Sequence, residues 1–139
     1  MVRSVVTSRY PNVKVILSHG GGFLPYAAYR FAGLTATMVD TSRNADELIT
    51  EFRRFYFDTA LSATPAALPA LLAFAEPGHV LYGSDWPFAP PKSASTTTTT
   101  WRPTPATLPA TNRGNAENLF PRLAKQRPQV TEVAAEPDP

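Results

Sequence analysis

Nearly all apolar segments of this chain lie before Phe88, and this distribution limits the size of its core. The last 51 residues, from Ala89 onward, contain nine of the 15 prolines and five consecutive threonines, Thr96 to Thr100. A segment of this composition buries little apolar surface, so we expect much of it to be loop or disordered. The core then draws on about 90 residues, which excludes a complete eight-stranded α/β barrel of roughly 250 residues.

Three short apolar segments have the composition of buried parallel strands, and helical patterns separate them. The predicted strands cover Val13–Ser18, Phe55–Thr59 and His79–Gly83. The predicted helices begin near Pro25, Asn44 and Thr64. Proline favours a first helical turn, and Asn44 followed by Glu47 resembles a capping box. Alternation of strands and helices predicts an α/β fold with a parallel sheet.

The prolines and the flanking composition divide the chain further. Residues 1–10 have the pattern of the end of a helix that begins before Met1, and Pro69 should kink the third helix or delay its start. We expect one α/β domain over 1–89 and a Pro/Thr-rich low-complexity linker over 90–112. A C-terminal helix of the same domain is expected over 113–125, followed by a disordered tail over 126–139.

Charge and cysteine content exclude several classes of protein. The net charge is +2 and the basic residues are dispersed, so we expect no nucleic-acid partner. The chain has no cysteine, which excludes disulfides and thiolate metal sites. The longest apolar stretch is too short to span a bilayer, and no secretory signal follows Met1. We therefore expect a cytoplasmic protein without a membrane partner.

Polar side chains follow the three predicted strands where each ends. His19, Asp58 and Asp85 should meet at the carboxyl edge of the sheet, where parallel α/β folds bind ligands. Imidazole nitrogen and carboxylate oxygen suit Zn²⁺ or a similar ion, but a catalytic zinc site needs three protein ligands. Alternatively, the histidine bonds a backbone carbonyl and each aspartate caps the next helix. His79 begins its strand and is expected at the surface.

Other residues near these strand ends also have two interpretations. Gly20, Gly21 and Gly22 either present amides to an anion or only allow a tight turn. Arg30 is a candidate for holding a substrate carboxylate, or else a surface residue. Trp86 and Phe88 either line a pocket for an aromatic ring or pack within a loop.

Four blocks of sequence occur in a fixed order along the chain. The blocks are Pro11–Gly22 with Leu24, Pro25, Tyr26 and Arg30; Tyr56–Ala60; Val80–Phe88; and Gly114–Ala116 with Leu119 and Phe120. Each block is modest, and the set is specific. Together they resemble the amidohydrolase-related family, which includes aminocarboxymuconate-semialdehyde decarboxylase and 6-methylsalicylate decarboxylase.

The resemblance implies the C-terminal part of a distorted (β/α)₈ TIM barrel, with about three parallel strands and flanking helices. It also implies one divalent metal ion, usually zinc, with His19 and Asp85 as ligands and Asp85 as a catalytic group that moves a proton. The family's other ligands are a His-x-His pair on the first strand, which this sequence does not contain. Ser62 occupies the position of a catalytic histidine in the muconate-semialdehyde enzyme.

We therefore expect a fragment of a metal-dependent enzyme, weakly active or inactive alone. The resemblance implies a carboxy-lyase on an aromatic or unsaturated carboxylic acid, or a hydrolase of a C–O or C–N bond that uses metal-bound water. Its partners would be the small acid and either a second copy or a complementing N-terminal half-barrel. The alternatives are a non-catalytic α/β remnant or interaction module without metal, and a small anion-binding module.

Overall fold

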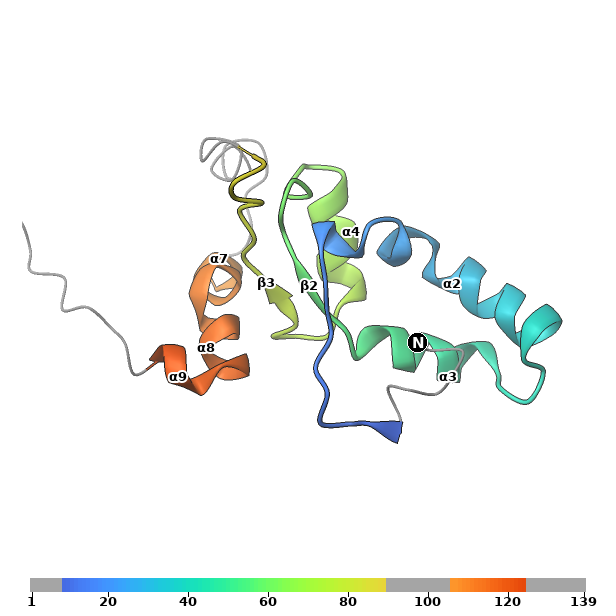
Figure 1. Ribbon diagram of the computed structural model, residues 1–139. Coiled ribbons are helices and arrows are strands. Elements are labelled where there is room, and N and C mark those ends of the chain that lie inside the picture. Colours follow the sequence, from blue (N-terminus) through green and yellow to red (C-terminus); the bar gives the residue numbers. More distant parts are fainter. Residues whose placement is uncertain (1–8, 90–105, 125–139) are drawn as a thin grey trace, which may run out of the picture.

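The computed structural model describes residues 9–89 and 106–124 (Figure 1). The predicted helix end before residue 9, most of the predicted linker and the predicted tail from 126 lie outside these ranges. Within them, strands and helices alternate along the chain in the predicted order.

Three parallel strands form the sheet in the order β1-β2-β3. These strands are β1 (Ile16–Leu17), β2 (Tyr56–Asp58) and β3 (Val80–Leu81). The predicted strands are confirmed, but each is shorter than expected. The prediction that the first strand is buried on both faces is wrong, because Val13 is 61% and Ile16 39% exposed. Among the described residues, β1 pairs with β2 alone, so its other edge is open.

Three helices cover one face of the sheet and make the core with it. They are α2 (Leu24–Leu34), α3 (Ala45–Arg53) and α4 (Ala67–Phe74), which lie to one side of the strands in Figure 1. Phe57 at the centre of β2 is fully buried among them, and Leu17 and Val80 pack on the same cluster. A π-helical segment, η2 (Thr35–Val39), extends α2. No helix in the described ranges has the length and hydropathy of a membrane span.

Local hydrogen bonds lie at or just before the starts of two of these helices. The side chain of Asn44 accepts a hydrogen bond from the Glu47 amide, and Glu47 bonds back to the Asn44 amide, which confirms the capping box. Thr64 Oγ1 accepts from the Ala67 amide at 3.1 Å in the turn that precedes α4, whose N-cap residue is Ala66. Pro69 then falls in the first turn, where the missing N–H breaks no helical hydrogen bond. Of the two expectations for Pro69, a kink or a later start of the helix, the later start is confirmed.

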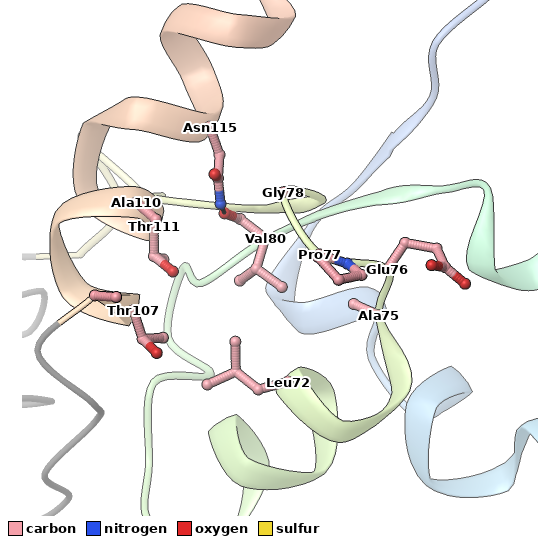
Figure 2. Close-up of a pocket in the computed structure, with 11 residues that line it drawn as sticks. Leu72, Ala75, Glu76, Pro77, Gly78, Val80, Thr107, Ala110, Thr111 and Asn115 are labelled. Carbon is pink, nitrogen blue, oxygen red and sulfur yellow. Dashed lines mark hydrogen bonds between the residues drawn. The ribbon is translucent and has the colours of Figure 1, made fainter.

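The C-terminal helices pack beside β3 (Figure 1). They are α7 (Thr107–Pro109), the π-helical η3 (Ala110–Gly114), α8 (Asn115–Leu119) and α9 (Pro121–Ala124). Helical structure thus begins at Thr107, earlier than the expected Arg113. A pocket of about 250 Å³ lies between η3, the end of α4 and the amino end of β3 (Figure 2).

Asn115 joins α8 to β3 at the edge of this pocket. Its side-chain amide is buried and donates to the Val80 carbonyl at 2.8 Å, as their arrangement in Figure 2 shows. We expect Asn115→Ala to lower the free energy of unfolding by about 1–3 kcal/mol, because a buried carbonyl loses its partner. Urea denaturation measures the change, and Asn112→Ala on the exposed side of η3 is the matched control. Equal effects of the two substitutions would contradict this role.

Candidate functional site

The carboxyl ends of the three strands bring His19, Asp58 and Asp85 together, as predicted. His19 follows β1, Asp58 ends β2, and Asp85 lies four residues beyond β3. The His19 Nε2 and Asp85 Oδ1 atoms are 3.8 Å apart. The His19 side chain is 49% exposed and the Asp85 side chain 19% exposed, so the pair is accessible from solvent. These two groups form the centre of the candidate site.

The ring of His19 is held by a backbone carbonyl on its other side. Its Nδ1 atom lies 3.1 Å from the Ala60 carbonyl oxygen. Because a carbonyl oxygen only accepts, this hydrogen bond assigns the proton to Nδ1. In the neutral ring, Nε2 then carries the lone pair, and it lies 3.8 Å from Asp85 Oδ1. The predicted alternative, a histidine that bonds a carbonyl, is therefore compatible with a ligand role, because metal-binding histidines commonly bond a carbonyl through their other nitrogen.

The two facing atoms fit two positions of a metal site, and a complete site needs a further ligand. Two ligands of one tetrahedral ion at about 2.1 Å would lie roughly 3.4 Å apart, close to the observed separation. Nitrogen and carboxylate oxygen are both suitable donors for Zn²⁺. Within residues 9–89 and 106–124, no group of three His, Cys, Asp or Glu side chains could hold a metal ion. The described residues therefore fit half of a metal site.

Asp58 faces the backbone of this site and caps no helix. Its Oδ1 atom accepts from the His19 amide at 2.9 Å and from the Ala60 amide at 3.0 Å. The predicted alternative, a cap on the next helix, does not apply because the N-cap residue of α4 is Ala66 and no side chain caps that helix. Asp58 therefore connects the ends of β1 and β2.

The glycine loop makes a tight turn between β1 and α2. Gly20, Gly21 and Gly22 all have positive φ angles, which favour glycine. The amides of Gly21 and Gly22 donate to the carbonyls of Ser18 and His19. Two amides of the predicted anion-binding loop are thus already used, so the geometry favours the interpretation as a turn.

A pocket of about 200 Å³ lies beside His19, between the starts of α2 and α4. Tyr26 and Ser62 contribute polar atoms to its wall, and most of the remaining lining is apolar. The full lining is His19, Gly20, Gly22, Pro25, Tyr26, Ser62, Ala66, Ala67, Ala70 and Leu71. Sequence reasoning assigned no pocket role to these alanines, which carry no chemical signal. Ser62 enters the sequence prediction as a departure from the family pattern, not as a pocket residue.

The other predicted site residues lie away from this pocket wall. Arg30 is exposed on α2, and neither Trp86 nor Phe88 lines the pocket beside His19. Trp86 is 69% and Phe88 88% exposed. The expectation of a surface position for His79 is wrong. Its ring is half-buried, stacks on Tyr56 and lies within 3.2 Å of two backbone carbonyl oxygens at the amino end of β3.

Comparisons with known proteins agree on one family. The sequence profile of the amidohydrolase family matches residues 2–122. The 6-methylsalicylic acid decarboxylase of Penicillium expansum is 42% identical over 127 residues, which cover 88% of this chain and 39% of that enzyme. The chain thus spans about two fifths of the length of this relative.

Two solved structures share the fold of the described residues. A dihydroxybenzoic acid decarboxylase from a Polaromonas species, with bound manganese and the inhibitor 2-nitroresorcinol, has a TM-score of 0.74 at 26% identity. That comparison covers 86% of this chain and 37% of the other. The 5-carboxyvanillate decarboxylase of Sphingomonas paucimobilis has a TM-score of 0.70 at 27% identity, covering 87% and 37%. The sheet and its helices are thus part of a TIM barrel, and the chain belongs to the amidohydrolase family.

Proposed function

We propose that this chain supplies half of the active site of a metal-dependent carboxy-lyase that acts on an aromatic carboxylic acid. The observation that carries the proposal is the pair of facing atoms, His19 Nε2 and Asp85 Oδ1, at the carboxyl edge of the sheet. The metal is proposed to be zinc, and its further ligands would come from a complementing N-terminal half-barrel. The decarboxylases among its relatives favour a carboxy-lyase over a hydrolase.

Each residue of the pair has a defined part in the proposed reaction. When bound, a divalent ion supplies Lewis-acid polarisation of the substrate oxygens. His19 would hold that ion through Nε2, because Nδ1 keeps its proton and donates it in a hydrogen bond to the Ala60 carbonyl. As the bond between the ring carbon and the carboxylate breaks, CO₂ leaves and the ring carbon takes a proton. Asp85 is proposed to deliver that proton as a general acid, from the carboxylate oxygen that does not hold the ion, and to recover a proton from solvent afterwards.

The substrate ring is proposed to occupy the apolar pocket beside His19. The pocket volume of about 200 Å³ is on the scale of a small substituted ring, and its lining is mainly apolar. Arg30 remains a proposed partner for a substrate carboxylate. Trp86 and Phe88 remain proposed covers for the ring, since both are exposed close to Asp85 in the chain.

Complementation tests the function directly. The 139-residue chain is co-expressed with the part of the Penicillium expansum relative that it does not match, and the complex is purified with zinc. We expect CO₂ release from 6-methylsalicylate by the complex and little release by either part alone. A stable, zinc-loaded complex without CO₂ release would contradict the proposed reaction. Failure to associate or to bind zinc would favour the non-catalytic alternative.

Filling the pocket should reduce activity of the complex. We expect Ala70→Leu to lower kcat/KM for 6-methylsalicylate by roughly tenfold or more, because the larger side chain occupies space assigned to the ring. Ala73→Leu is the matched control, since Ala73 lies on the exposed side of the same helix. If both variants retained full kcat/KM, the ring would bind elsewhere.

A further inference from the structure

We infer that Asp58 is a positioning residue that holds His19 in its metal-facing orientation. The inference rests on the proposed function for the metal itself. Its structural basis is a single carboxylate oxygen that accepts two backbone hydrogen bonds from the ends of two strands. The donors are the amides of His19 at 2.9 Å and Ala60 at 3.0 Å.

These two hydrogen bonds control both the backbone and the ring of His19. The first holds the His19 backbone in a left-handed conformation, with φ of +56°, that is unfavourable for a residue with a side chain. The second holds the Ala60 amide, and the carbonyl of the same residue accepts the Nδ1 proton of the imidazole ring. Asp58 thus acts on the ring through Ala60 and on the backbone directly.

The same strand end also holds the segment that leads to Asp85. The Thr59 amide donates to the Leu81 carbonyl, and the Gly83 amide donates to Thr59 Oγ1 at 3.2 Å. A Cβ atom on Gly83 would lie 3.0 Å from Asp58 Cβ and Cγ. Gly83 therefore packs directly on the Asp58 side chain, and a side chain at position 83 would crowd it. The carboxyl end of β2 lies between both candidate ligands and contacts the segments that carry them.

The test separates the geometry of Asp58 from its charge. Asp58→Asn removes the charge but keeps an oxygen that can accept both hydrogen bonds. Asp58→Glu keeps the charge, but its extra methylene moves the accepting oxygen away from the two amides, and Asp58→Ala removes the acceptor. Nitrogen-15 NMR of the imidazole rings in the 139-residue chain, at a pH where histidine is neutral, reports the His19 tautomer without metal. Titration with Zn²⁺ alone reports the dissociation constant.

We expect the Asn variant to retain the Nδ1–H tautomer and a zinc affinity within about threefold of the original chain. The Glu and Ala variants should show a mixture of tautomers and a dissociation constant raised about 10- to 100-fold. The inference would be overturned if the Glu variant kept the tautomer and the zinc affinity while the Asn variant lost them. It would also be overturned if folded Glu and Ala variants kept the original tautomer. If the Ala variant fails to fold, the comparison of the Asn and Glu variants still tests the inference. If the original chain does not bind Zn²⁺, the proposal of a metal site is contradicted. The tautomer measurement needs no metal, so it still tests the role of Asp58 in that case.

Discussion

Replacing Gly21 with alanine is expected to lower the free energy of unfolding by about 3 kcal/mol or more. Two costs combine at this position. The φ angle of +73° is unfavourable for a residue with a side chain. A Cβ atom would also lie 2.8 Å from Cδ1 of Phe57, the fully buried centre of the core. Since Phe57 is enclosed by its neighbours, it has little room to move away.

Two other glycines separate these costs in urea denaturation experiments. Gly22 has a similar φ of +59°, with ψ of −116°, but nothing lies within 4 Å of the added Cβ, so Gly22→Ala should cost only the backbone strain of about 1–3 kcal/mol. Gly33 lies within α2 with open space around it, and Gly33→Ala should stabilise by about 0.5–1 kcal/mol. Equal losses for Gly21→Ala and Gly22→Ala would show that the contact with Phe57 adds nothing.

Removing either candidate ligand should abolish most zinc binding by the 139-residue chain. We expect His19→Gln or Asp85→Asn to raise the dissociation constant for Zn²⁺ by roughly 100-fold or more, since losing a direct ligand exceeds the 10- to 100-fold cost of losing a supporting contact. Competition with a chelator of known affinity measures this constant. Because only two donors are present among the described residues, the original chain should itself bind more weakly than a complete site.

The chain offers matched controls for both substitutions. It contains only two histidines, and His79 lies at the opposite end of β3 from Asp85. His79→Gln and Asp46→Asn, on the exposed start of α3, should leave the zinc affinity within about threefold. Zinc binding that survives His19→Gln but not His79→Gln would contradict the proposed site. Equal affinity in all four variants would indicate adventitious binding.

Local signals predicted much of the fold. The capping box at Asn44 and Glu47 and the apolar composition around Phe57 depend on residues close in sequence, so the second helix and the central strand were predictable. The burial of β1 was not, because Ile16 has an apolar side chain whether or not a strand pairs with its open edge. Similarly, the early helix at Thr107 packs on η3, which in turn contacts β3, and its local composition is typical of a loop.

The sequence predicted those site residues whose side chains have distinctive chemistry and lie at the ends of predicted strands. His19 and Asp85 have distinctive side chains at strand ends, and parallel strands place such ends together. The contacts that hold them were less evident, because the Ala60 carbonyl and the Gly83 amide are backbone groups with no signature in the sequence. The small residues Ala67 and Ala70 likewise line a pocket only through the packing of α4 against the start of α2.

The sequential order of the sheet has a consequence for the folding pathway. β2 lies between the strands that precede His19 and Asp85, so these side chains meet only after both parallel pairings and both helical crossovers have formed. An ion that needs both ligands therefore recognises a late, nearly native state. Such binding would slow unfolding far more than it accelerates folding. Zinc would thus act mainly on the kinetic lifetime of the folded chain and would not nucleate it.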